Sequence, residues 1–121
     1  MHRVLIVEDE DTVARALERS LKRHGAVVRV LLETTALEAT LLEFQPTHVV
    51  TDLRMTPRDG IAVLSVAKQL VPAAVRTVLS GSLESLTQQA LDTVRPCRLV
   101  SKPWLESTLA HDIGLTKGVP S

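Results

Sequence analysis

Five side chains that could handle a metal ion or a phosphoryl group each follow a short apolar segment of this sequence. They are three carboxylates, one hydroxyl and one amine: Glu8, Asp9, Asp52, Ser80 and Lys102. Carboxylates packed together repel one another, which raises their pKa values unless a cation relieves the repulsion. Mg²⁺ prefers oxygen ligands and is usually held by one or two carboxylates together with phosphate oxygens. The set therefore predicts a magnesium site.

The same residues are suited to phosphoryl transfer. A carboxylate such as that of Asp52 can attack phosphorus and form an acyl phosphate. The transferring group carries negative charge on its equatorial oxygens, which a metal ion on one side and an ammonium on the other would stabilise. Lys102 could supply that ammonium, and Ser80 could donate a hydrogen bond to the same oxygens.

Each of these residues also has an ordinary structural explanation. The acids of the run 8–11 could cap a helix and offset its dipole. Asp52 and Ser80 could be turn residues, and Lys102 could be a solvated surface lysine. All of these explanations would have to hold together in one fold, so phosphate chemistry is favoured. Asp59 is different, because we expect it only to cap a helix.

Apolar periodicity predicts five strands, each followed by a helix, that must position these side chains. The predicted strands are 4–7, 27–31, 49–51, 77–79 and 99–100. The predicted helices are 11–24, a second one with a Thr35–Glu38 capping box that ends before Pro46, 61–70, 83–93, and a short one marked by Leu105, Leu109 and Ile113. Such alternation indicates an α/β fold with a parallel sheet, whose ligands bind outside the carboxyl ends of the strands. The five side chains should meet at that edge.

Composition limits the class of protein. The 121 residues fit a single domain over 1–121, with a core of about 3–113 and a tail over 114–121. Fourteen basic residues balance fourteen acidic ones, and aromatics make up only 2%, so nothing favours nucleic acid or a lipid surface as a partner. No apolar stretch approaches the ~18 residues that span a bilayer. The single Cys97 and the missing leader pattern predict a cytoplasmic protein.

Four motifs carry a resemblance to a known family. They stand in order, each at a predicted strand end: Glu8-Asp9, the run from Asp52 to Gly60, Ser80-Gly81 and Lys102-Pro103. Each motif alone is weak, but together they resemble the receiver domain of bacterial response regulators in two-component signalling. The resemblance covers about residues 3–113. It implies a (βα)5 flavodoxin-like, doubly wound sheet of five parallel strands in the order 2-1-3-4-5.

The resemblance also implies a role for each site residue. Asp52 would be the phosphoacceptor, and Lys102 would pair with the phosphoryl group or, before phosphorylation, with Asp52. Ser80 would be the switch hydroxyl. Mg²⁺ would be bound directly by Asp9 and Asp52, through water by Glu8, and by the main-chain carbonyl of Arg54. The Lys102–Pro103 peptide would be cis.

Partners follow from the same resemblance. A sensor histidine kinase or phosphotransfer protein would supply the phosphoryl group, and a downstream protein or output domain would bind the face made by the fourth helix, the fifth strand and the last helix. A homodimer is possible. The domain would not be an enzyme, because it would catalyse only its own phosphorylation and dephosphorylation. Leu99 stands where the family often has an aromatic switch residue, which leaves that coupling open. The alternative is a receiver-like interaction module that takes no phosphate.

Overall fold

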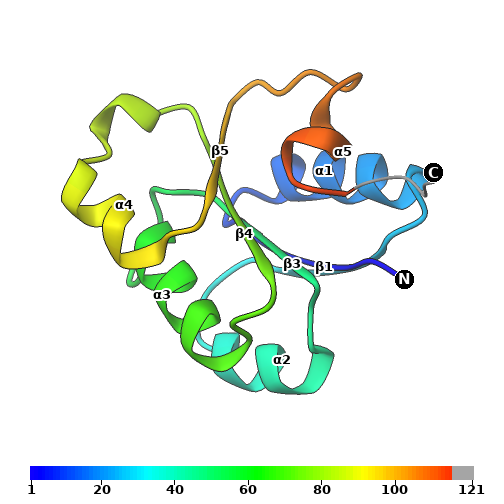
Figure 1. Cartoon of the computed structure of the whole chain (residues 1–121). Coiled ribbons are helices and arrows are strands. Elements are labelled where there is room, and N and C mark those ends of the chain that lie inside the picture. The colour runs from blue at the N-terminus through cyan, green and yellow to red at the C-terminus, as the bar shows by residue number, and fades with distance from the viewer. Residues whose placement is uncertain (116–121) are drawn as a thin grey trace.

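Five parallel strands form the sheet that positions the predicted site (Figure 1). The computed structural model describes residues 1–115. The strands are β1 Arg3–Val7, β2 Val27–Leu31, β3 His48–Thr51, β4 Val75–Ser80 and β5 Arg98–Ser101. Their order is β2-β1-β3-β4-β5, which confirms the predicted topology. Each of the five predicted strands is present; β1 and β3 begin one residue earlier than predicted, and β4 and β5 are longer at both ends.

Helices cover both faces of this sheet, as Figure 1 shows. On one face lie α1 Asp11–Arg23 and α5 Leu109–Asp112, and on the other lie α2 Leu37–Phe44, α3 Gly60–Leu70 and α4 Gln88–Val94. A short 3-10 helix, η1 Leu83–Ser85, precedes α4. None of the helices within residues 1–115 combines the length and the apolar character that crossing a bilayer requires.

Strand β1 is buried on both sides and divides the core into two layers. Leu5 and Val7 pack with α2 and α3, whereas Val4 and Ile6 pack with α1 and α5. All four side chains are fully buried. Successive side chains of a strand point to opposite faces, so a continuous apolar run is what a strand between two helical layers requires. The acidic residues that follow β1 are therefore attached to a strand whose apolar side chains are fully buried.

The beginnings of α2 and α3 test two predicted caps. Asp59 caps α3 as predicted, since its carboxylate accepts a hydrogen bond of 2.9 Å from the amide of Ala62. The predicted Thr35–Glu38 capping box is wrong. Helix α2 begins after Ala36 without a side-chain cap, because the Glu38 carboxylate is taken up in an ion pair with Arg58.

The predicted helix over 83–93 is divided into two short pieces. Leu86 has an extended backbone between η1 and α4, and the hydroxyl of Thr87 then accepts a 3.0 Å hydrogen bond from the Ala90 amide to start a new helix. The cap of Thr87 competes with continuation of the first turn, because a side-chain oxygen that satisfies a helix N-terminus favours beginning there.

The last helix is shorter than its apolar spacing predicts. Leu109 is buried on α5, but Leu105 precedes the helix and is 67% exposed. Within the predicted tail, Leu115 is buried and its amide donates to the carbonyl of Ala110 at 2.7 Å. The rest of the predicted tail, 116–121, lies outside the described residues.

Gly60, the first residue of α3, lies directly against the main chain of Asp52. A Cβ atom at this position would be 2.3 Å from the Asp52 carbonyl oxygen and 2.9 Å from the Cα of Leu53. Both are backbone atoms and cannot rotate away. The amide of Gly60 also donates a 2.8 Å hydrogen bond to the Leu53 carbonyl. The close approach of α3 to the end of β3 therefore requires glycine.

We predict that Gly60→Ala lowers the free energy of unfolding by about 1–3 kcal/mol, because the added methyl group overpacks a rigid contact. Chemical denaturation monitored by circular dichroism measures the change. Gly81→Ala is the matched control, since its nearest neighbour would be 4.0 Å away. Equal stability of the Gly60 variant and the wild type would contradict the proposed contact.

Candidate functional site

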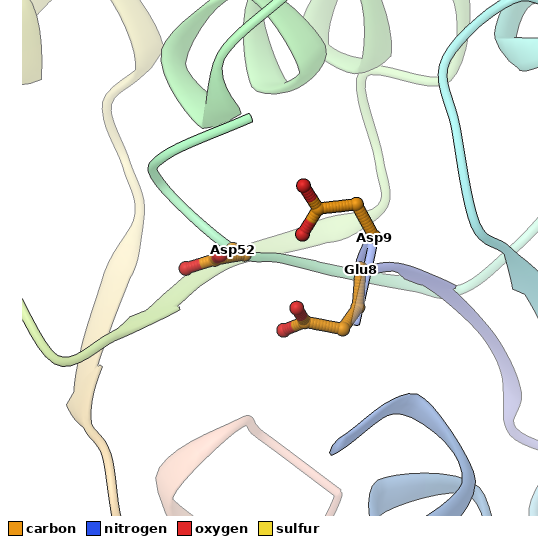
Figure 2. Close-up of side chains that lie close together, drawn as sticks. All are labelled: Glu8, Asp9 and Asp52. Atoms are coloured by element: carbon orange, nitrogen blue, oxygen red, sulfur yellow. The ribbon is translucent and has the colours of Figure 1, made fainter. Parts of the chain in front are cut away.

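Three carboxylates meet at the carboxyl ends of β1 and β3 (Figure 2). One oxygen each from Glu8, Asp9 and Asp52 lies within 4.8 Å of the others. Neighbouring parallel strands end at the same edge of a sheet, and β1 pairs directly with β3, with Val7 opposite Thr51. The structure thus brings together the three acids that the sequence predicts as metal ligands, and their spacing is compatible with a single cation.

Lys102 reaches this acidic cluster from the end of β5. Its backbone amide donates a 2.9 Å hydrogen bond to the carbonyl of Ser80, which holds the residue beside the end of β4. Its Nζ lies 2.8 Å from Oε1 of Glu8 and 3.5 Å from Oδ1 of Asp52. The predicted pairing with Asp52 is present, but Glu8 is the closer partner. Nothing in the sequence indicated this preference.

Burial explains why Glu8 needs that partner. The residue is only 2% exposed, and burial raises the pKa of its carboxyl. The hydrogen bond and positive charge of Lys102 act in the opposite direction, and the charge of Asp52 adds to the rise. For Lys102 itself, burial works to lower the pKa, but the hydrogen bond to Glu8 and the charges of Glu8 and Asp52 leave it raised. The ammonium is therefore retained as a counter-ion inside the site.

Asp52 is held firmly and still meets solvent. Its amide donates to the Val7 carbonyl at 3.0 Å, and its Oδ1 accepts a 2.8 Å hydrogen bond from the amide of Leu53. Its side chain is 13% exposed, so a carboxylate oxygen remains accessible at the surface. A side chain oriented by the main chain at the end of a strand is well placed to act as a nucleophile.

Ser80 ends β4 between the strands that carry Asp52 and Lys102. The residue is buried, and its hydroxyl accepts a 3.0 Å hydrogen bond from the amide of Ser82. The hydroxyl proton remains available for donation to an incoming oxygen. Gly81, which follows, is exposed and leaves room next to Lys102.

The loop from Leu53 to Asp59 is braced against α2. The guanidinium of Arg58 pairs with the Glu38 carboxylate and also donates to the carbonyl of Thr34. This ion pair lowers the pKa of Glu38 to about 2. Arg54 belongs to the same loop and lines, together with Asp9, a cavity of about 620 Å³. The Lys102–Pro103 peptide is cis, as predicted.

Comparison with known proteins identifies the family. Residues 4–113 match the family model of the response regulator receiver domain, and the chain therefore belongs to that family. The hydrogenase transcriptional regulatory protein HoxA of Bradyrhizobium diazoefficiens is 31% identical over 91% of this chain, and the transcriptional regulatory protein PrrA of Mycobacterium leprae is 30% identical over 65% of it. This chain is a receiver domain of two-component response regulators.

Solved structures agree on the fold. The chemotaxis protein CheY4 of Vibrio cholerae superimposes with a TM-score of 0.82 at 18% identity, over 92% of this chain and 94% of that one. A response regulator receiver domain protein from Clostridium thermocellum gives 0.80 at 21% identity, over 93% and 91%. The chain spans only 23% of HoxA and 35% of PrrA, which are longer proteins.

We predict that Lys102→Met raises the pKa of Glu8 further, because the variant removes the hydrogen bond and the charge that now lower it. Carboxyl-carbon NMR titration without divalent cations measures the pKa. A carboxyl whose folded-state pKa is raised stabilises the fold most when protonated. The free energy of unfolding therefore falls as pH rises from the ordinary carboxyl pKa through the folded value. The pH range over which stability falls is therefore wider in Lys102→Met, because the folded-state pKa of Glu8 is higher there. Lys22→Met, which removes one of the two basic partners of Glu18 far from the cluster and should leave the Glu8 pKa unchanged, is the control. An unchanged or lower Glu8 pKa in Lys102→Met would contradict the ion pair between Lys102 and Glu8.

Proposed function

We propose that Asp52 accepts a phosphoryl group in a magnesium-dependent reaction and so switches a protein-interaction surface. The observation that carries this proposal is the convergence of the Glu8–Asp9–Asp52 cluster with Lys102 at one sheet edge. The family supports it, because receiver domains of two-component systems are signalling switches.

The carboxylates offer a set of oxygen ligands that suits Mg²⁺. Asp9 is exposed and Asp52 is partly exposed, so both could bind the ion directly, whereas the buried Glu8 would act through water. The main-chain carbonyl of Arg54 would complete the protein ligands. When bound, the ion would neutralise the carboxylates and polarise the phosphoryl oxygens. Hard oxygen donors without sulfur or imidazole favour Mg²⁺ over softer metals.

Transfer would proceed by direct displacement at phosphorus. A carboxylate oxygen of Asp52 forms a bond to phosphorus, while the bond from phosphorus to the donor nitrogen or oxygen breaks and the donor leaves with its electron pair. Lys102 would stabilise the phosphoryl oxygens, since its Nζ already lies 3.5 Å from Asp52 Oδ1. The Ser80 hydroxyl, which accepts from the Ser82 amide, would donate its proton to another phosphoryl oxygen. Both would form charge-assisted hydrogen bonds, which bind the phosphorylated state selectively.

The phosphoryl donor and the output follow from this chemistry. A histidine kinase or phosphotransfer protein would supply the group, and small acyl phosphates could replace it. The face of α4, β5 and α5 would carry the signal to a downstream protein, an output domain or a second copy. On this face Leu99 is 45% exposed, and Leu105, just before α5, is 67% exposed. The domain would catalyse only its own phosphorylation and dephosphorylation. The free thiol of Cys97 is consistent with a cytoplasmic location.

We predict that the protein gains one phosphoryl group when it is incubated with acetyl phosphate and Mg²⁺, as measured by intact-protein mass spectrometry. Asp52→Asn should gain none, because an amide is a poor nucleophile. Chelation of Mg²⁺ with EDTA should also prevent the gain. The matched control is Asp11→Asn, which removes an acid in the first turn of α1, outside the cluster, and should be modified like the wild type.

Two outcomes would contradict the proposal. Modification of Asp52→Asn to the same extent as the wild type would place the acceptor elsewhere. No modification of the wild type, with acetyl phosphate or with a histidine kinase, would favour the alternative of an interaction module that takes no phosphate.

A further inference from the structure

Helix α4 packs against α3, but only its last residue is fully buried. Of its seven residues only Val94 is buried, where its side chain packs into the core with α2 and α3. Ala90 and Leu91 are half-buried, and the other four residues, Gln88, Gln89, Asp92 and Thr93, are exposed. A helix of this length has little stability of its own in water. The contacts at its C-terminal end, where its one fully buried side chain lies, therefore contribute strongly to its position.

The buried guanidinium of Arg76 holds that end. Arg76 lies on β4 and is only 3% exposed. Its Nε donates to the Val94 carbonyl at 3.2 Å, and its Nη1 donates to the carbonyls of Pro72 and Ala74 at 3.2 and 3.3 Å. Among residues 1–115 no carboxylate forms an ion pair with it.

Main-chain carbonyls can balance the buried charge of Arg76 because of their positions in the fold. The carbonyl of Val94 closes the C-terminal end of α4, where the helix dipole carries partial negative charge. A buried charge is costly unless it is hydrogen-bonded, so the arrangement is stable only while α4 and the turn before β4 both supply their carbonyls. Arg76 thus bridges β4, the turn from Pro72 to Ala74, and α4.

The opposite end of α4 faces open space next to the acidic cluster. Thr87, which caps the helix, and Ala90 in its first turn line the cavity of about 620 Å³, together with Asp9. Leu86, extended between η1 and α4, lines it as well. Leu83 and Leu86 pack against the core next to this end, but among residues 1–115 no fully buried arginine bonds to it as Arg76 bonds to the other end.

We propose that Arg76 is a positioning residue that fixes the C-terminal end of α4 to β4. The part that rearranges on phosphorylation is then η1 together with the first turn of α4, over the cavity. The second half of this proposal rests on phosphorylation of Asp52, whereas the first half does not. Arg76 and Ser80 lie four residues apart on one strand and so on the same face of it. One end of β4 responds to the phosphoryl group, while the other anchors the helix.

Amide hydrogen exchange followed by NMR on the full chain tests the anchor without phosphate. In Arg76→Met, the amides of Asp92, Thr93 and Val94 should exchange roughly tenfold faster or more, because hydrogen bonds from a charged donor are lost and the end of α4 opens locally. Arg98→Met is the matched control. It removes an exposed arginine from β5 and should leave α4 exchange unchanged. Arg76→Lys keeps the charge but not the fork of donors, so it should restore protection only in part. Unchanged exchange in Arg76→Met, or full restoration of protection in Arg76→Lys, would contradict the proposal that the Arg76 guanidinium fixes the end of α4.

If Arg76→Met does not fold, Arg76→Lys alone still tests the anchor, since exchange protection equal to that of the wild type would show that the guanidinium does not fix the end of α4.

A second experiment adds acetyl phosphate and Mg²⁺ to the wild type. Exchange should change at Ser85 to Ala90 and stay constant at Asp92 to Val94. A uniform change in exchange rate along α4, in protein shown by mass spectrometry to be phosphorylated, would overturn the claim that only η1 and the first turn of α4 rearrange. An absence of phosphorylation would instead count against the proposed function and leave the result of the first experiment standing.

Discussion

Burial of a carboxylate at the end of β1, an inner strand of the sheet, is the constraint on which the rest of the site depends. Glu8 follows β1, the strand covered on both faces, and it is almost entirely shielded from solvent. A carboxylate in that position is unfavourable unless a cation reaches it. Lys102 supplies the cation from the end of β5, two strand positions beyond β3 in the sheet. The pair therefore links the inner strand β1 to the edge strand β5 across the end of the sheet.

This arrangement gives the site two kinds of carboxylate. Glu8 is occupied by Lys102, whereas Asp9 and Asp52 are more exposed and do not share so close a contact with the ammonium. A divalent ion arriving from solvent would meet Asp9 and Asp52 first. Lys102 would then be freer to bind a phosphoryl group. One ammonium can in this way serve the resting structure and the phosphorylated one. The proposed anchor at Arg76 uses the same principle, since a buried cation there joins β4 to α4.

The strand ends were predictable because their signals are local. Short β-branched runs ending in Glu8, Asp52, Ser80 and Lys102 place those side chains at one edge of any parallel sheet. The failures arise where distant contacts compete with local patterns. Glu38 belongs to a plausible capping box, but Arg58, twenty residues away, binds its carboxylate instead. Leu105 has the right spacing for α5, yet the helix begins later. The closeness of Gly60 to Asp52 and of Glu8 to Lys102 depends on tertiary packing, which one sequence does not reveal.

The most direct test of the acidic cluster is its affinity for Mg²⁺, measured by isothermal titration calorimetry on the unphosphorylated protein. We predict one saturable site, with an affinity roughly tenfold or more lower in Asp9→Asn because a ligand is lost. Removal of an acid outside the cluster, in Asp11→Asn, should leave the affinity close to that of the wild type. Absence of a saturable site, or equal affinity in Asp9→Asn and the wild type, would contradict the claim that this sheet edge is built to hold a cation.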